Sequence, residues 1–142
     1  MHLTLHVGIG TFQPIRTKTI IEHKMQPEQF FIPEETSKAL INARKDRKKI
    51  VGVGSTVTRV LESVELDSLP PSGTSGWTNL FIYPGSKFKE VDHLITNFHL
   101  PKSTLYLLVC AFAGKKLTKE AYKEAIIKKY RFYSYGDAML II

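Results

Sequence analysis

The strongest constraint on the fold is a strand–turn–helix pattern in residues 50–64. Residues 50–53 read Ile-Val-Gly-Val, a short apolar run typical of a buried strand. Gly54 opens a turn, after which apolar residues recur at helical spacing up to Val64. Residues 94–98 read Leu-Ile-Thr-Asn-Phe, which is typical of another strand, and they lead into a polar turn and an apolar helix that we expect to end at Gly114. Alternating strands and helices predict the α/β class, with a mixed or largely parallel sheet flanked by helices.

The other segments complete a single α/β domain over residues 1–142, since this length is that of one ordinary domain. Pro33, Ser103 and Thr118 suit helix N-termini, and we expect helices to begin at or after them. Residues 66–79 are rich in Pro, Ser and Gly, which predicts an exposed loop. Further short strands or β-prone pieces are predicted at residues 3–7, 19–21, 30–32 and 80–83 and at the C-terminal end.

The charge balance of the chain indicates a polyanionic partner. Twenty Lys and Arg residues stand against 13 Asp and Glu residues, which gives a formal net charge of +7 and a pI near 9.5. Nucleic acid is the first candidate for that partner, and solubility is the alternative explanation. The basic cluster at residues 44–49 favours helix capping and solubility over phosphate contact.

Several classes of protein are disfavoured by composition. Cys110 is the only cysteine and lies in an apolar run, so we expect a buried, inert thiol, no internal disulfide and a cytoplasmic location. No apolar run approaches the roughly 20 residues of a membrane span, and no export signal is visible. The histidines lack metal-ligand spacing with cysteine, so we predict no metal site.

The turn after residues 50–53 is the first candidate site. In Gly52-Val-Gly54-Ser-Thr, backbone N–H groups at the start of a helix are placed to hold an anion. Ser55, Thr56 and Arg59 are the candidate binding residues, with Arg59 one helical turn beyond Ser55. The alternative is an ordinary strand-to-helix turn in which Ser55 or Thr56 caps the helix.

A second candidate site follows the strand at residues 94–98. Ligand sites in α/β folds lie where strands end and helices begin. Asn97, His99 and Lys102 meet that description, since His99 can exchange a proton near neutral pH and Lys102 can hold an anion. The alternative is that Asn97 and His99 only cap the turn and satisfy backbone groups.

Two further places carry weaker indications. His6 precedes the Gly8-Ile-Gly10 break and could face a ligand, although a lone strand histidine is more often structural. Tyr133, Tyr135 and Asp137 bracket Gly136 near the C-terminus, where the aromatic rings could stack on an unpaired base or belong to the core.

Three blocks of the chain resemble signature motifs of the S-adenosylmethionine:tRNA ribosyltransferase-isomerases of queuosine synthesis. The most specific stretches are Thr-Asn-Phe-His-Leu-Pro-Lys-Ser-Thr at residues 96–104 and Ser-Tyr-Gly-Asp-Ala-Met-Leu at residues 134–140. The first block comprises residues 5–14, 22–25 and 32–36, the second residues 53–62, and the third residues 81–85, 91–92, 94–105 and 130–141.

The resemblance implies transfer and isomerisation of the ribosyl moiety of S-adenosylmethionine. The acceptor is 7-aminomethyl-7-deazaguanine at the tRNA wobble position, the product is epoxyqueuosine, and adenine and methionine are released. It implies S-adenosylmethionine as a substrate, tRNA as a partner and no prosthetic group. His99 or His6 would transfer protons, Asp137 would pair with the aminomethyl cation, and Ser55, Thr56 and Arg59 would hold a carboxylate or phosphate.

The resemblance covers the C-terminal portion of a larger two-domain fold, whose β-barrel-like domain is absent from these residues. We therefore expect the chain to hold part of an active site, and exposed sheet edges give a route to self-association. The competing hypothesis is a non-catalytic, basic RNA-binding module.

Overall fold

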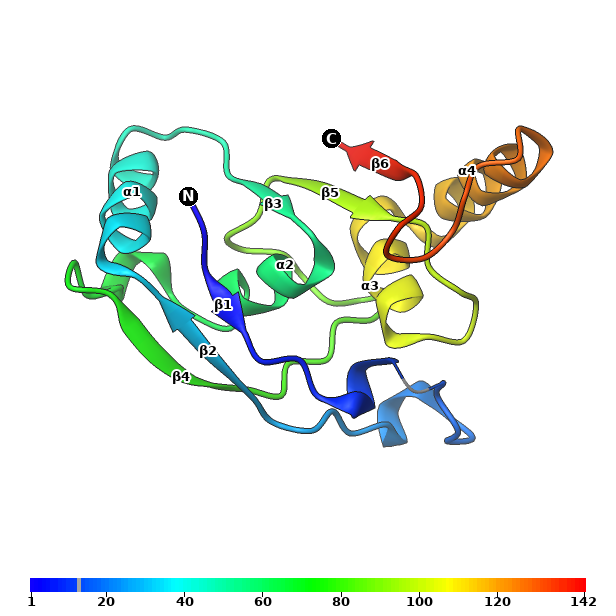
Figure 1. The fold of residues 1–142 in the computed structure, drawn as a ribbon, viewed down its shortest axis with the longest axis horizontal. Coiled ribbons are helices and arrows are strands. Elements are labelled where there is room, and N and C mark those ends of the chain that lie inside the picture. Colours follow the sequence, from blue (N-terminus) through cyan, green and yellow to red (C-terminus); the bar gives the residue numbers. More distant parts are fainter. Residues whose placement is uncertain (13) are drawn as a thin grey trace.

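One half of the molecule is built on an antiparallel sheet (Figure 1). The computed structural model describes residues 1–12 and 14–142, so Gln13 of the first block lies outside the described residues. In this sheet β2 (Glu28–Ile32) lies between β1 (Thr4–Leu5) and β4 (Thr74–Thr78), and both pairings are antiparallel. Alternate residues of β2 are buried, which places Glu28 on the same inner face as Phe30 and Ile32.

The other half contains a mixed sheet. β5 (His93–Asn97) pairs in parallel with β3 (Val51–Val53) and antiparallel with β6 (Ala138–Ile141). The carboxyl ends of β3 and β5 therefore lie at the same edge of the sheet. α2 (Ser55–Leu61) follows β3 directly, contacts β1, β3 and β5, and lies between the two sheets (Figure 1).

Three more helices complete the fold. α1 (Glu34–Lys45) lies at one end of the molecule, and α3 (Thr104–Ala113) and α4 (Lys115–Ile127) lie at the other (Figure 1). Within residues 1–12 and 14–142, no helix combines the length and apolarity that crossing a membrane requires. Short 3-10 turns η1, η2 and η3 occupy Ile9–Phe12, Ile20–Glu22 and Leu66–Ser68.

The hydrophobic core is divided between the two halves of the molecule. Val60 and Leu61 of α2 pack with Phe30 and Ile32 of the antiparallel sheet. At the other end, Phe98 packs against α3 and α4, and its ring lies 5.3 Å from the ring of Tyr122, centroid to centroid. Leu94 of β5 and Leu108 of α3 form a third cluster with Ile82.

The predicted α/β class with a mixed sheet is confirmed. The strands at residues 50–53, 94–98 and the C-terminus are present, and Ser103 caps α3 by accepting a hydrogen bond from the Tyr106 backbone N–H at 3.1 Å. The described strands form two separate three-stranded sheets. The reason is that β2 pairs with β1 and β4 and never joins β5.

The exposed loop predicted at residues 66–79 is wrong. The segment contains η3 and β4, and Leu66 and Leu69 are buried in the core. The Ser37 hydroxyl donates a hydrogen bond to the Pro70 carbonyl, which fixes the segment against α1. Gly73, at φ +88°, then lets the chain pass so close to β2 that a Cβ atom would lie 2.6 Å from the Ile32 carbonyl oxygen.

Three other local predictions are corrected. α4 begins at Lys115 after Gly114, so Thr118 is a buried residue inside the helix whose hydroxyl donates to the Gly114 carbonyl at 2.9 Å. Residues 19–21 belong to a 3-10 turn. Residues 80–83 lie outside any strand although Ile82 is buried, since side-chain packing there replaces backbone pairing.

Replacing Leu94 with alanine should lower the free energy of unfolding by about 2–5 kcal/mol, since the side chain is fully buried and its loss leaves a cavity. Leu140→Ala in the adjacent strand is the matched control. Because Leu140 is 62% exposed, this substitution should lower the free energy of unfolding far less. Urea unfolding followed by circular dichroism measures both. Equal losses for the two variants would contradict the described packing.

Candidate functional site

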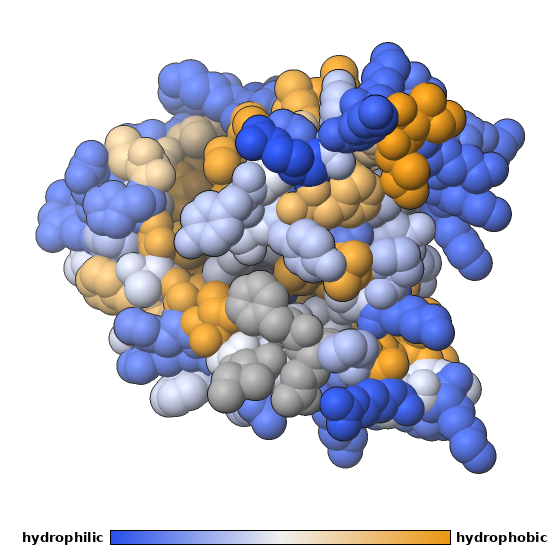
Figure 2. Space-filling model, turned by 45° about the vertical axis from the view of Figure 1, so that its right-hand side comes forward, coloured by the Kyte–Doolittle hydropathy of each residue, from blue (hydrophilic) through white to orange (hydrophobic). Residues whose placement is uncertain are grey.

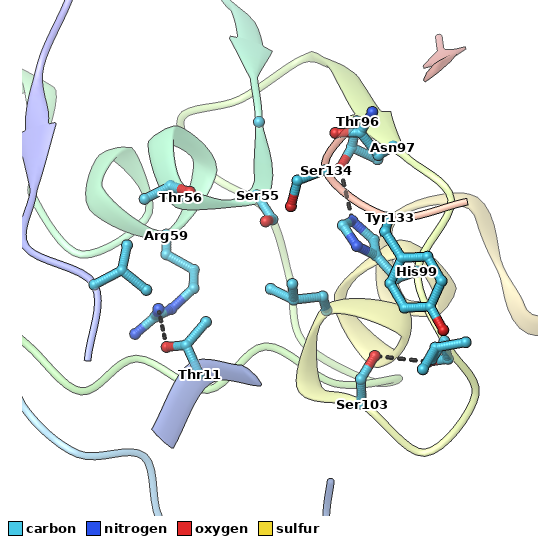
Figure 3. Close-up of a pocket in the computed structure, with 14 residues that line it drawn as sticks. Thr11, Ser55, Thr56, Arg59, Thr96, Asn97, His99, Ser103, Tyr133 and Ser134 are labelled. Atoms are coloured by element: carbon cyan, nitrogen blue, oxygen red, sulfur yellow. Dashed lines mark hydrogen bonds between the residues drawn. The ribbon is translucent and has the colours of Figure 1, made fainter. Parts of the chain in front are cut away.

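A cavity of about 370 Å³ opens where α2 begins and β5 ends (Figure 3). Its volume is in the range of sites for small molecules. Side chains of α2 face those of the segment after β5 across the space, and the turn at residues 133–134 forms a third wall (Figure 3). The cavity is lined by Val7, Thr11, Gly54, Ser55, Thr56, Arg59, Thr96, Asn97, His99, Leu100, Ser103, Leu105, Tyr133 and Ser134.

The turn from β3 into α2 forms the first wall. Gly54 has φ +100°, a conformation that favours glycine, and its N–H donates to the Ile95 carbonyl of β5 at 2.7 Å. Gly54 is itself the N-cap residue, so the alternative in which Ser55 or Thr56 caps the helix is wrong. Both residues instead line the cavity, where their hydroxyl groups are available to a ligand.

Arg59 lies in a buried ion pair beside this wall. Its Nη1 is 2.5 Å from Glu28 Oε2 and 3.3 Å from the Thr11 hydroxyl oxygen, and its Nε donates to the Leu80 carbonyl at 3.1 Å. Both side chains of the pair are almost fully buried. Among the described residues, buried Nη2 has no hydrogen-bond partner. Most N–H donors of Arg59 therefore bond to other parts of the protein, although the residue also lines the cavity.

Glu28, which the sequence did not suggest, organises the turn that contains η1. Its Oε1 accepts hydrogen bonds from the Gly8 backbone N–H and the Thr11 hydroxyl, each at 2.7 Å. Burial alone would raise the pKa of Glu28, but the hydrogen bonds from Thr11 and Gly8 and the Arg59 charge outweigh it and hold the pKa below 4.5. The alternation in residues 28–32 was the available signal, because it places Glu28 on the core face.

His99 forms the opposite wall. Its Nε2 lies 2.9 Å from the Thr96 hydroxyl oxygen, and its backbone N–H donates to the Tyr122 hydroxyl at 2.9 Å. Burial lowers the pKa of His99 to about 4 and raises the pKa of Tyr122 to about 12. His99 is therefore a neutral imidazole at pH 7, oriented by one side-chain hydrogen bond and able to accept or donate one proton.

Asn97 lines the cavity, and its side chain also satisfies backbone groups. The second role is the one that the alternative interpretation of the sequence gave to this residue. Its side-chain amide donates to the carbonyls of Gly136 and Asp137, each at 3.3 Å. These bonds attach the C-terminal turn to the end of β5. They also hold Tyr133 and Ser134 against the cavity, together with the Tyr133 N–H bond to the Phe98 carbonyl at 3.0 Å.

Four predicted site residues do not line the cavity. His6 and Lys102 are exposed, and Tyr135 is 99% exposed. The Asp137 carboxylate accepts hydrogen bonds from the backbone N–H and the guanidinium of Arg131, at 2.7 and 3.2 Å, and these bonds lower its pKa. The structure thus brings together Ser55, Thr56, Arg59, Asn97 and His99.

No group of three or more metal-ligating side chains occurs within the described part of the chain.

A family model described as "Queuosine biosynthesis protein" matches residues 1–141. The chain belongs to this family. Its curated relatives include the S-adenosylmethionine:tRNA ribosyltransferase-isomerase of Caldanaerobacter subterraneus subsp. tengcongensis, which is 55% identical over 140 residues, 99% of this chain and 41% of the relative. The enzyme of that name from Halothermothrix orenii is 51% identical over 142 residues, 100% of this chain and 42% of the relative.

A solved structure has the same fold over most of this chain. The crystal structure of the S-adenosylmethionine tRNA ribosyltransferase from Thermotoga maritima superposes with a TM-score of 0.74 at 50% identity. The match covers 81% of this chain and 40% of that chain. The chain therefore spans about two fifths of the length of the relatives it matches, and the family assignment drawn from the motif blocks is confirmed.

Glu28→Gln should lower the free energy of unfolding by about 3–5 kcal/mol near neutral pH, because it leaves the buried Arg59 charge without its partner. The pKa of Glu28 is depressed in the folded state, so the ion pair stabilises the protein above pH 4.5 and its contribution is lost as the pH falls through the folded-state value. Denaturant unfolding from neutral to acidic pH measures the effect. Glu34→Gln, in an exposed pair with Lys38, should change stability little, and equal effects would contradict the assignment.

The imidazole of His99 should take up its proton with a midpoint of about 4, and not near the ordinary 6.5. An unfolded chain binds this proton already near pH 6.5, so the stability of the fold should decrease as the pH falls from 6.5 toward 4. NMR titration of the histidine ring protons, assigned with His99→Gln, measures the midpoint. A midpoint near 6.5 would show a solvated ring and contradict the described environment.

Proposed function

We propose that this chain forms part of the active site of a ribosyltransferase-isomerase in queuosine synthesis. In the proposed reaction, the ribosyl moiety of S-adenosylmethionine is transferred to 7-aminomethyl-7-deazaguanine at the tRNA wobble position and isomerised. The product is epoxyqueuosine, and adenine and methionine leave. The supporting observation is that every described residue lining the cavity belongs to one of the three motif blocks.

The cavity is suited to S-adenosylmethionine in size and in chemistry. Apolar side chains of Val7, Leu100 and Leu105 supply surface for the nucleoside, and the hydroxyl groups of Ser55 and Thr56 supply hydrogen bonds. We assign these two hydroxyls, beside the positive charge of Arg59, to the carboxylate of the methionine moiety, since all three residues line the same wall of the cavity.

Proton transfer is assigned to His99. The sulfonium of S-adenosylmethionine acidifies the adjacent C5′ protons of the ribose, so a neutral imidazole at this position can remove one. The bond between Nε2 and the Thr96 hydroxyl orients the ring toward the cavity and leaves Nδ1 for the substrate. His6 and Asp137 lie outside the cavity, and we therefore assign them no catalytic role.

A chimera tests the function. The chain replaces the matching segment of the Caldanaerobacter relative, to which it is 55% identical, and the purified chimera is incubated with S-adenosylmethionine and precursor tRNA. Adenine and methionine should be released only when tRNA is present, with the unaltered relative as the positive control. A folded chimera that releases no adenine would contradict the proposal.

His99→Gln in the chimera should lower kcat by about 10²–10⁴-fold, the usual contribution of a general acid–base group. The KM for S-adenosylmethionine should change little, because the amide keeps the polarity of the site. His2→Gln is the matched control, since His2 is exposed and lies outside the cavity, and its kcat should equal that of the unaltered chimera. Full activity of His99→Gln would refute the assignment of the base.

A further inference from the structure

The positive charge of the chain is concentrated on α4 and the residues after it. Residues 115–131 contain seven of the 20 basic residues and two of the 13 acidic ones, so this segment carries five of the seven net charges. Only Thr118, Tyr122 and Ala125 of α4 are buried, and the rest of the helix surface is exposed. In Figure 2 hydrophilic side chains project from several edges of the molecule, its right-hand side included.

The lysines of α4 are separated from its acidic residues. Lys115, Lys119 and Lys123 follow one another at four-residue spacing, so they share one face at intervals of about 6 Å along the axis. Glu120 and Glu124 lie on another face. Among the described residues, none of these three lysines forms an ion pair, whereas Lys128 pairs with Glu124 at 3.1 Å. Like charges at this spacing repel one another, and an external anion relieves that repulsion.

The helix that carries this lysine face, residues 115, 119 and 123, is hydrogen-bonded to a segment that lines the cavity. The Tyr122 hydroxyl on α4 accepts the hydrogen bond from the His99 backbone N–H. After α4 the chain returns to the cavity, where Tyr133 and Ser134 line the wall and Tyr133 is 60% exposed. The helix that carries the lysines is therefore bonded directly to the segment after β5 that lines the cavity.

We propose that the lysine face of α4 binds the phosphate backbone of the RNA whose modified base enters the cavity beside Tyr133. The inference rests on the proposed function and adds the surface that holds the tRNA. Lysine contacts to phosphates fix the position of a nucleic acid without reading its sequence, and an exposed aromatic ring stacks on an unpaired base.

Salt-dependent binding tests the surface. Fluorescence anisotropy of labelled precursor tRNA with the 142-residue chain gives the affinity between about 50 and 200 mM KCl. The triple variant K115Q/K119Q/K123Q should reduce the slope of log affinity against log salt by about 2–3, since each phosphate contact contributes about 0.7–0.9. At the lower salt concentration its affinity should fall by more than about tenfold.

The control is K38Q/K45Q/K48Q, which removes the same charge from and around α1 at the other end of the molecule (Figure 1). Its slope should stay close to that of the unaltered chain. Equal changes in the two triple variants, or an unchanged slope in the α4 variant, would overturn the proposal. Salt-insensitive binding would do so as well, because contacts to phosphates make the affinity fall as the salt concentration rises.

The chimera separates this inference from the proposed function. With the α4 substitutions, the KM for tRNA should rise while kcat stays unchanged, because none of the three lysines lines the cavity. Adenine release with an unaffected KM would refute the surface and leave the function standing. The chimera can also fail to release adenine while the α4 substitutions still abolish its RNA binding. That result would support the RNA-binding surface and refute the proposed function.

Discussion

The ion pair between Glu28 and Arg59 is the interaction on which the arrangement of the cavity depends. Two buried charges are tolerated only when each is paired and hydrogen-bonded, and this pair joins β2 to α2. The same carboxylate accepts bonds from Gly8 and Thr11, and the Thr11 carbonyl accepts a bond from the Thr104 hydroxyl at the start of α3 at 3.2 Å. The carboxylate thus joins the first and second blocks, and Thr11 joins them to the third, although the blocks are distant in sequence.

The mixed sheet supplies the second constraint. Because β3 and β5 are parallel, their carboxyl ends lie at the same edge of the sheet. The hydrogen bond from the Gly54 N–H to the Ile95 carbonyl holds the segments that follow the two strands next to each other. Ser55 and His99 consequently face one space although 44 positions separate them in the sequence. β6 returns antiparallel to β5 and places Tyr133 and Ser134 beside the same edge.

Local sequence patterns predicted the parts of this site that depend on local structure. Gly54 and the end of β5 were found from strand–turn–helix periodicity, and with them Ser55, Thr56, Asn97 and His99. Arg59 was predicted as a ligand donor, but its partner Glu28 lies 31 positions away, and pairing at that distance leaves no trace in a local pattern. Composition misled at residues 66–79, where a β-strand pairs with β2 despite the abundance of Pro, Ser and Gly. Lys102 and Tyr135 belong to the right motifs, yet their side chains lie outside the cavity.

We propose that the cavity between α2 and the segment after β5 holds S-adenosylmethionine. Titration of the isotopically labelled chain with S-adenosylmethionine, followed by backbone amide chemical shifts, tests it most directly. We expect saturable shifts at Gly54, Ser55, Asn97 and His99, with the amides of α1 unaffected. No saturable shift, or shifts confined to residues outside the cavity, would contradict binding in this cavity.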